Sequence, residues 1–198
     1  MTSERDVRIL RAGDRTAEAW KNGGGVTRQI AVRPEGSGTG DFAWRVSLAE
    51  VAADGPFSAF PGVDRTLTLA EGAGMDLTVD GVRRLVDERY APQRFAGDVA
   101  TGCRLLDGPV VNFNVMYRRD AVRAEVAVVR GDLALAATGG GSLLVIALAG
   151  AASLEGAGAE GGVRLETYDA LLATGGEQGV LHLSAAGRAA VVRFTPAG

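Results

Sequence analysis

Two short stretches of the sequence place arginine and amide side chains where they could bind a small anion. In DFAWRVSLAEV, an extended chain puts Arg45 and Ser47 on the face opposite Trp44, because strand side chains alternate between two faces. In NFNVMYRR, the same alternation puts Asn112 and Asn114 on one face. Guanidinium groups bind carboxylates in a bidentate manner, and amides supply neutral hydrogen bonds. The pattern predicts a site for a small carboxylate.

Arg28 is predicted to lie on an apolar strand face, because it alternates with Val26, Ile30 and Val32. A buried arginine without a counter-charge is costly, so it must meet a carboxylate of the protein or an anionic ligand. The sequence leaves both alternatives open. The internal carboxylates that could serve are Asp41, Glu50 and Asp64, of which Asp64 is also a candidate partner for Arg45.

The glycine run in WKNGGGVTRQI, from Gly23 to Gly25, does not fit a nucleotide-binding loop. Such a loop needs a lysine after the glycines and then a helix, whereas Lys21 precedes them and a β-branched run follows. Two interpretations remain. The glycines let backbone N–H groups approach a ligand or allow an unusual φ, or they form a tight turn or bulge at the corner of a barrel.

Histidine and cysteine occur once each, at His182 and Cys103, which bounds the available chemistry. A nucleophilic triad and a zinc, iron or copper site both need more such side chains, so no cofactor and no transition metal are expected. An oxygen-only magnesium or calcium site remains formally open. His182 shares a strand face with Val180 and Ser184, opposite Leu181 and Leu183, and is interpreted as structural. A metal-free enzyme would need a general base, for which Glu50 and Asp64 are the available carboxylates.

The 198 residues carry a net charge of −3 and are 46% hydrophobic, enough for the core of one globular unit or two small ones. Because no basic field exists, nucleic acid is not an expected partner. The N-terminal MTSERDVRIL does not resemble a signal peptide, and the longest apolar run, residues 143–152, is too short for a bilayer. Together with the single cysteine, these features predict a cytoplasmic protein without a membrane partner.

Short alternating runs such as RTLTLAE and MDLTVDG, with glycine-rich turns between them, predict an all-β protein of antiparallel strands. Two longer stretches resemble each other at a spacing of about 79 residues, which predicts two tandem β domains. We place them at residues 1–122 and 123–198. The one helical candidate is TAEAW, near Thr16. The matching positions of the repeat are Gly72 and Gly150, Arg84 and Arg164, Leu85 and Leu165, and Gly97 and Gly176.

The two predicted domains differ in polarity. The arginine, amide and aromatic motifs all lie in the first, which is therefore expected to carry the binding site. The second contains few polar side chains outside its turns and is interpreted as a structural partner. An exchange of strands between the two within one compact unit is left open.

In order and spacing, the segments WKNGGGVTRQI, DFAWRVSLAEVAADGPFSAFPGVDRTLTLAEG and NFNVMYRRD resemble the HutD/Ves family, named for histidine utilisation. The resemblance covers the chain from about Trp20 to Arg119. It implies a bicupin, that is, two small antiparallel, jelly-roll-like β-barrels in one chain with little helix. It also implies a modulator of bacterial histidine breakdown that binds a small carboxylate such as a formylglutamate-like intermediate. No catalytic activity is established for the family.

One position departs from the family pattern, because Asn112 stands where the family usually has an aspartate. If the family aspartate acts as a general base or a metal ligand, Asn112 cannot take over that role. If the aspartate only takes part in a hydrogen-bond network, asparagine can partly replace it. A binding protein is therefore expected rather than an enzyme. The alternative is a metal-free cupin isomerase or hydrolase that acts on a small acid.

The expected ligand is a small dicarboxylate or N-acyl amino acid in the first barrel. Arg45 and Arg65 would hold its carboxylates, with Arg28 as a further candidate. Neutral hydrogen bonds would come from Asn22, Ser47 and Asn114. The aromatic walls would be Trp44, Phe57 and Phe60. Self-association into a homodimer is left open. The candidate ligand-binding residues are Trp20, Asn22, Gly23, Gly24, Arg28, Trp44, Arg45, Ser47, Phe57, Phe60, Asp64, Arg65, Asn112 and Asn114.

Overall fold

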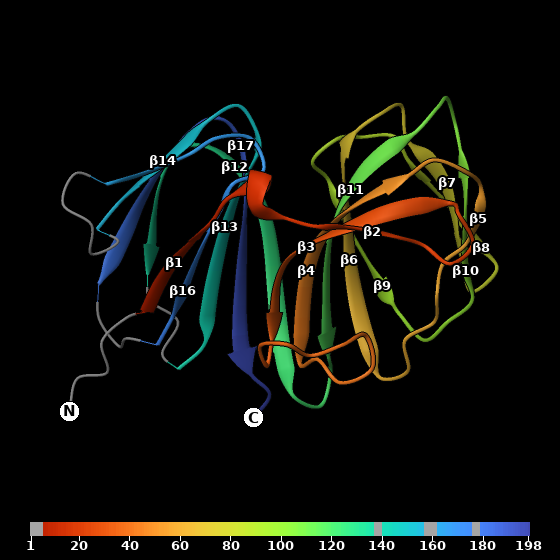
Figure 1. Ribbon diagram of the computed structural model, residues 1–198, viewed down its shortest axis with the longest axis horizontal. Coiled ribbons are helices and arrows are strands. Elements are labelled where there is room, and N and C mark those ends of the chain that lie inside the picture. The colour runs from red at the N-terminus through yellow and green to blue at the C-terminus, as the bar shows by residue number, and fades with distance from the viewer. Residues whose placement is uncertain (1–5, 137–139, 157–161, 176–178) are drawn as a thin grey trace. The chain divides into compact units, whose positions relative to one another are not determined.

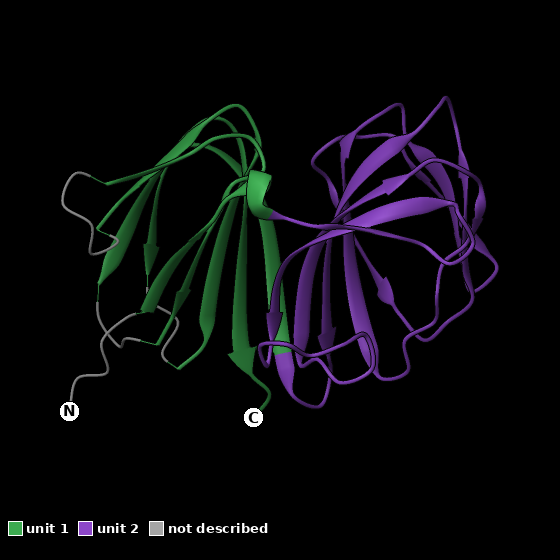
Figure 2. Ribbon diagram, viewed as in Figure 1, with its two compact units in different colours: residues 1–14, 123–198 green, residues 15–122 purple. Residues whose placement is uncertain are grey.

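The computed structural model describes residues 6–136, 140–156, 162–175 and 179–198, which fold almost entirely into β-strands (Figure 1). They belong to two compact units, each with its own sheets and core (Figure 2). The all-β class with little helix is therefore confirmed. Unit 1 contains Met1–Asp14 and Arg123–Gly198, and unit 2 contains Arg15–Val122.

Unit 2 consists of two antiparallel sheets whose inner faces share an apolar core. The six-stranded sheet has the order β2-β3-β4-β11-β6-β9, and the four-stranded sheet has the order β5-β10-β7-β8. The strands of the larger sheet are β2 (Ala17–Ala19), β3 (Gly25–Arg33), β4 (Trp44–Val51), β11 (Val110–Arg118), β6 (Val63–Glu71) and β9 (Pro92–Ala96). Those of the smaller sheet are β5 (Gly55–Pro56), β10 (Thr101–Leu105), β7 (Met75–Val79) and β8 (Val82–Val86).

The core of unit 2 follows from the alternation of apolar residues in these strands. Leu67 and Leu69 of β6 pack with Met75 and Leu77 of β7, and all four side chains are fully buried. Full burial of such a side chain contributes about 1.5–3 kcal/mol relative to exposure. A second, smaller cluster packs beside the first and consists of Val32, Phe42, Val63 and Met116, with Phe60 against it.

Unit 1 contains a seven-stranded sheet of order β1-β16-β13-β17-β14-β15, with β12 paired to β17. Its core is apolar throughout, formed by leucine, valine and alanine side chains of these strands. Unit 1 therefore matches the expectation of few internal polar groups. Its strands are β1 (Asp6–Leu10), β12 (Val122–Ala136), β13 (Ser142–Ala149), β14 (Ala152–Glu155), β15 (Val163–Leu165), β16 (Ala170–Thr174) and β17 (Val180–Pro196).

The repeat in the sequence has a counterpart in strand pairing. In unit 2, β6 pairs with β11 and β7 with β8. In unit 1, β13 pairs with β17 and β14 with β15. Gly72 follows β6 with a φ of 98°, and Gly150 follows β13 with a φ of 68°, a backbone region that favours glycine. Gly176, the partner of Gly97 in the repeat, lies outside the described residues.

The N-terminal segment departs from two expectations. Residues up to Asp14 belong to unit 1 rather than to the first predicted domain, because β1 pairs antiparallel with β16. The helix predicted at TAEAW was wrong, since Ala17–Ala19 form β2 and pair with residues 26–28 of β3. So short a segment gains little as an isolated helix, whereas the β ladder satisfies its backbone groups. The only helix in the described ranges is the 3-10 turn η1 (Ala12–Asp14).

The glycine run forms the tight turn between β2 and β3. Trp20 N–H donates to the Gly25 carbonyl at 2.9 Å, and Gly23 N–H donates to the Trp20 carbonyl at 3.0 Å. Gly23 has a φ of 70°, which favours glycine. At Gly25, a Cβ atom would lie 2.4 Å from the Glu50 carbonyl oxygen, so glycine lets β3 approach β4. The run therefore forms a tight turn, and Gly23 in it also has the unusual φ that glycine allows.

We expect Gly25→Ala to lower the free energy of unfolding by about 1–3 kcal/mol, because the new methyl group collides with backbone that cannot rotate away. Gly24→Ala is the matched control and should cost less than about 1 kcal/mol, since its Cβ would meet the movable Asn22 side chain at 3.4 Å. Urea unfolding of both variants measures the difference. Equal stability of the two would contradict the role given to Gly25.

Candidate functional site

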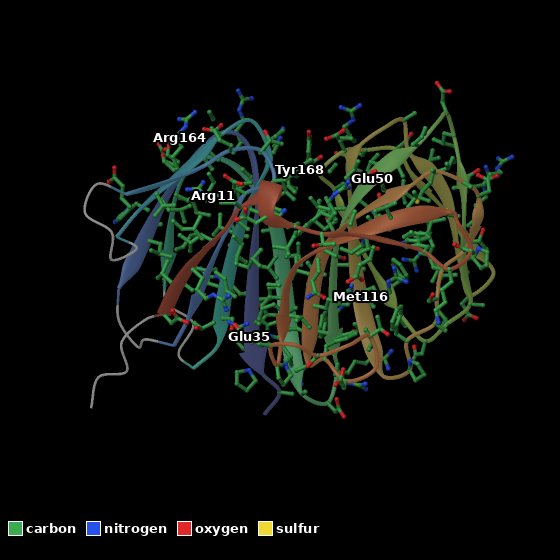
Figure 3. All side chains as sticks on the ribbon, viewed as in Figure 1. Arg11, Glu35, Glu50, Met116, Arg164 and Tyr168 are labelled. Carbon is green, nitrogen blue, oxygen red and sulfur yellow. The ribbon has the colours of Figure 1, made fainter. Side chains whose placement is uncertain are left out.

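One face of the six-stranded sheet in unit 2 collects the two predicted carboxylate-binding arginines. Residues that pair directly across antiparallel strands point to the same side of a sheet. Arg45 on β4 and Arg65 on β6 both pair with Met116, which lies on β11 between them. Met116 is labelled in Figure 3. Phe95 on β9 continues this row beside Arg65. The two guanidinium groups therefore start from the same face of the sheet.

The next two rows bring the amides onto that face. Asn114 pairs with Leu67 and Ser47, and Asn112 pairs with Leu69. Because both leucines pack against the four-stranded sheet, this face points into the interior of unit 2. The structure thus brings together five of the predicted residues from three strands. We call them the polar cluster: Arg45, Ser47, Arg65, Asn112 and Asn114.

Arg65 is a buried cation without a carboxylate partner among the described residues. It is 8% exposed, and its Nε atom has no hydrogen-bond partner within the described ranges. The centre of its guanidinium lies 5.1 Å from the ring centroid of Phe57, 5.3 Å from Phe95 and 5.8 Å from Phe60. Burial lowers the pKa of Arg65 to about 10, so the side chain is still protonated at neutral pH.

Arg45 has only a distant counter-charge. Its side chain is 10% exposed, and its NH2 atom lies 3.8 Å from the Glu18 Oε2 atom. Its Nε atom is buried and has no hydrogen-bond partner in the described part of the chain. Burial lowers the pKa of Arg45, and the Glu18 carboxylate partly offsets that lowering.

The two asparagines carry the largest unsatisfied hydrogen-bonding capacity. Asn112 is 1% exposed, and neither its Oδ1 nor its Nδ2 atom has a partner among the described residues. Asn114 Nδ2 donates to the Asn112 carbonyl at 3.4 Å, while Asn114 Oδ1 is unpaired within the same ranges. A buried polar atom without a partner costs about 1–3 kcal/mol. Such a cluster is expected where water or a ligand completes the hydrogen bonds.

Aromatic side chains line the same region. Trp20 and Phe57 are half-buried against the core of unit 2, with their rings edge to face at 6.3 Å. The indole Nε1 of Trp20 donates to Thr27 Oγ1 at 2.8 Å, which fixes the ring beside β3. Phe60 packs on Phe42 at 6.4 Å. Of the three predicted wall residues, Phe57 and Phe60 lie beside Arg65, whereas Trp44 lies on the opposite face of β4. Trp20 lies against Phe57 instead.

Arg28 and Asp64 lie away from the polar cluster and have partners of their own. Arg28 NH1 forms an ion pair with Glu50 Oε1, so its partner is an internal carboxylate. Asp64 accepts hydrogen bonds from Arg94 at 2.8 Å and Arg119 at 2.6 Å, rather than from Arg45. Burial alone would raise the pKa of Asp64, but the hydrogen bonds from these two arginines outweigh burial and lower it.

The remaining predicted residues are also placed elsewhere. Trp44 lies on the face of β4 opposite Arg45, and the guanidinium of Arg33 stacks over its ring at 5.8 Å. Asn22 and Gly23 are exposed in the β2–β3 turn, where Asn22 Oδ1 accepts from Gly24 N–H at 3.1 Å. These side chains shape the turn rather than the polar cluster.

Glu18, Thr27 and Gln29 are three polar side chains beside the polar cluster that the sequence analysis did not select. Glu18 pairs with Thr27 across β2 and β3, and Gln29 pairs with Ser47 of the cluster across β3 and β4. All three therefore share the inner face of the sheet. The prediction of a helix at TAEAW gave no reason to place Glu18 at the site. In a strand, Glu18 points to the face opposite that of Ala17 and Ala19. Gln29 had the right signal, a polar residue two positions from Thr27.

Two surface grooves, of about 440 and 400 Å³, lie in unit 1 rather than at the polar cluster. Ser153 and Ser184 line both, and His182 and Glu155 line the smaller one. These are exposed faces of β14 and β17, where water can satisfy the polar groups. We assign the candidate site to the polar cluster, because buried polar atoms without partners are found there.

Metal ligation finds no support in the described ranges, where no group of three or more His, Cys, Asp or Glu side chains is placed to hold an ion. Cys103 is buried, and burial raises the pKa of its thiol, which disfavours the reactive thiolate. Over the same described ranges, the chain forms no helix with the length and apolar character to span a membrane.

Comparison with known proteins gives a family match over most of the chain. The family model for HutD matches residues 12–192. An uncharacterised 21.2 kDa protein in the hutC 3′ region of Pseudomonas putida is 33% identical over 188 residues, which are 95% of this chain and 97% of that protein. Protein Ves from Citrobacter koseri is 38% identical over 130 residues, 64% of this chain and 66% of that protein.

Solved structures agree with that match. The structure of HutD from Pseudomonas fluorescens SBW25 is 33% identical and superposes with a TM-score of 0.85, covering 98% of this chain and 100% of that one. More distant structures share the fold alone. The bacterial pirin YhhW from Escherichia coli is 11% identical with a TM-score of 0.64, covering 96% of this chain and 98% of that one. The predicted bicupin class is thereby confirmed.

Proposed function

The chain belongs to the HutD family, and from this premise we propose that it binds a small carboxylate metabolite and thereby modulates histidine utilisation. The ligand class is a dicarboxylate or an N-acyl amino acid, such as the intermediate N-formylglutamate. The relative from Pseudomonas putida, described as a protein in the hutC 3′ region, supports the link to histidine breakdown. We also propose that the protein acts in the cytoplasm, in line with its single cysteine.

The observation that carries this proposal is the unpaired charge of Arg65. A buried cation is retained only where something offsets its desolvation. The three phenyl rings offset part of that cost, and a carboxylate ligand would offset more by accepting charge-assisted hydrogen bonds.

The surrounding groups suit a ligand with more than one polar function. Arg45 offers a second cation, and Asn112 and Asn114 offer unsatisfied amide donors and acceptors beside it. A dicarboxylate with an acyl-amide group presents complementary partners for each of these. Trp20 and Phe57 would cover the carbon skeleton of such a ligand.

The enzymatic alternative needs a general base within reach of a bound acid. The two carboxylates considered for that role, Glu50 and Asp64, form ion pairs with arginines outside the polar cluster. Asn112 cannot act as a base, because an amide does not accept a proton at neutral pH. Among the described residues, Glu18 is the carboxylate that faces the cluster, through its contact with Arg45. Because neither of the bases that the sequence offered lies there, we propose binding rather than an isomerase or hydrolase.

We expect Arg45→Met to weaken the binding of N-formylglutamate by about ten- to a hundredfold, since a charge-assisted hydrogen bond contributes about 1.5–3 kcal/mol. Arg28→Met is the matched control, because Arg28 pairs with Glu50 outside the cluster, and it should bind like the wild type. Isothermal titration calorimetry measures both affinities, and melting curves check that the variants fold.

Titration of N-formylglutamate, glutamate and glutarate into the wild-type protein tests the ligand class directly. A ligand that binds only the folded state also raises the melting temperature. Failure of all three acids to bind the wild type would refute the proposed function. Binding by the wild type with unchanged affinity in Arg45→Met would remove that arginine from the site and leave the function standing.

A further inference from the structure

Glu18 is the one carboxylate that the described structure places against the polar cluster. It lies at the centre of β2, a three-residue edge strand whose residues are all exposed. Its side chain is 68% exposed, whereas the side chain of Arg45, which it faces, is 10% exposed. Glu18 thus approaches a buried cation from the solvent-exposed edge of the sheet.

The contact between these two residues is loose. Glu18 Oε2 and Arg45 NH2 are 3.8 Å apart, beyond the 2.7–2.9 Å of a charge-assisted hydrogen bond. By contrast, the Arg119–Asp64 and Arg94–Asp64 contacts of the same unit are 2.6 and 2.8 Å. Glu18 therefore supplies opposite charge to Arg45 without using the hydrogen-bond donors of its guanidinium group.

The charges of the site do not balance in this arrangement. Arg45 and Arg65 contribute two positive charges, and Glu18 contributes one negative charge at Arg45 alone. Arg65 has no carboxylate partner among the described residues. One ligand carboxylate at Arg65 would neutralise the cluster, while a second at Arg45 would meet the carboxylate of Glu18.

From this we infer that Glu18 is a built-in competitor for the second carboxylate of the ligand at Arg45, an inference that rests on the proposed function. In the structure, Glu18 faces Arg45 across 3.8 Å. A dicarboxylate displaces it, and the released side chain moves into water at little cost because it is already mostly exposed. A monocarboxylate binds at Arg65 and leaves Glu18 in place.

This arrangement makes Glu18 a determinant of specificity between ligands of different charge. A dicarboxylate must overcome the Glu18–Arg45 attraction, whereas a monocarboxylate does not. Removing the charge of Glu18 should therefore improve the binding of dicarboxylates selectively. A residue that merely stabilised the fold would change the affinity for both classes equally or not at all.

The test compares two ligands that differ only in one charged group, N-formylglutamate and N-formylglutamine, and is repeated with glutarate and its monoamide. Calorimetry is carried out on the wild type, on Glu18→Gln, and on the control Glu50→Gln, whose carboxylate pairs with Arg28 outside the cluster. We expect Glu18→Gln to bind the dicarboxylates about three- to tenfold more tightly. The monocarboxylates should change by less than about twofold, and the control should match the wild type with every ligand.

The outcomes separate this inference from the proposed function. Binding of these acids to the wild type, with the same preference in Glu18→Gln, would overturn the role of Glu18 and leave the proposed function intact. Weaker binding of dicarboxylates by Glu18→Gln would also overturn it. Binding of none of the four ligands to either protein would end both proposals. Glu18→Ala serves as a second variant in case glutamine alters the edge strand, which melting curves would reveal.

Discussion

The Arg65→Met variant is expected to lose ligand binding and gain stability at the same time. Binding of N-formylglutamate should fall by at least about a hundredfold, because removing one partner of a buried charge pair costs about 2–5 kcal/mol. The free energy of unfolding should rise by about 1–3 kcal/mol, because a buried charge is replaced by an apolar side chain of similar volume. Calorimetric titration and urea unfolding measure the two effects.

The expected gain in stability follows from the pKa of Arg65. Desolvation lowers that pKa to about 10 in the folded protein, well below the value of a solvated arginine. Because the folded pKa is the lower one, keeping the charged form costs folding free energy at every pH below about 10. This cost is the one expected for a buried cation without a counter-charge among the described residues. This cost is relieved only as the pH rises above about 10, so neutral pH carries the whole penalty.

Methionine is chosen because its thioether can keep favourable contacts with Phe57, Phe60 and Phe95. The control is Arg94→Met, whose arginine is 64% exposed and pairs with Asp64, and it should bind the ligand like the wild type. Wild-type affinity in Arg65→Met would remove Arg65 from the site. A loss of more than about 1 kcal/mol in stability would show that the guanidinium–ring contacts outweigh desolvation.

In unit 1, Asp169→Asn is expected to lower the free energy of unfolding by about 2–3 kcal/mol at pH 7. Asp169 is 6% exposed and fastens the N-terminal segment to the sheet of this unit. Its carboxylate accepts hydrogen bonds from Arg11 NH1 at 2.7 Å, Ala12 N–H at 2.8 Å and Glu166 N–H at 3.2 Å. Asparagine keeps the shape but loses the charge and one acceptor oxygen.

The effect of this substitution should depend on pH in a defined direction. Burial alone would raise the pKa of Asp169, but the hydrogen bonds from Ala12, Arg11 and Glu166 outweigh burial and hold it below its usual value. A carboxyl group with a lowered folded pKa stabilises the protein above its unfolded pKa, near 4, and this stabilisation is lost as the pH falls through the folded pKa. The stability difference between wild type and Asp169→Asn should therefore be constant from about pH 5 to 8 and shrink below about pH 4.

Urea unfolding at a series of pH values gives this difference in free energy of unfolding. The contributions of the other carboxyl groups cancel in the difference, because both proteins contain them. Asp132→Asn, at an exposed carboxylate of the same unit, should match the wild type within about 0.5 kcal/mol. A difference that persisted unchanged below pH 3 would mean that the charge of Asp169 is not what holds the segment.

Local alternation made part of the site predictable from the sequence. The opposite orientations of Arg45 and Trp44, and the shared face of Asn112 and Asn114, depend only on the two-residue period of a strand. The strand pairing agrees with both predictions. The repeat of about 79 residues predicted two tandem β domains for the same reason, because each stretch repeats a local pattern of strands and glycine turns.

Local patterns failed where an irregularity or a weak segment intervened. A β-bulge between Gln29 and Ala31 shifts the register of β3, so Val32 lies on the face opposite Arg28 rather than beside it. The segment around Glu18 has no strong preference of its own and becomes a strand only by pairing with β3. The sequence alone could not show that a glutamate approaches Arg45.

The sequence by itself determined the fold class, the side-chain faces within each regular strand and the set of polar residues available for binding, because these follow from local composition and period. Only the tertiary structure decided which charges meet. It paired Arg28 with Glu50 and Asp64 with Arg94 and Arg119, and it left Arg65 among three phenyl rings. The physical reason is that cross-strand register joins residues far apart in the chain, so a partner is fixed by the pairing of whole strands rather than by its neighbours in sequence.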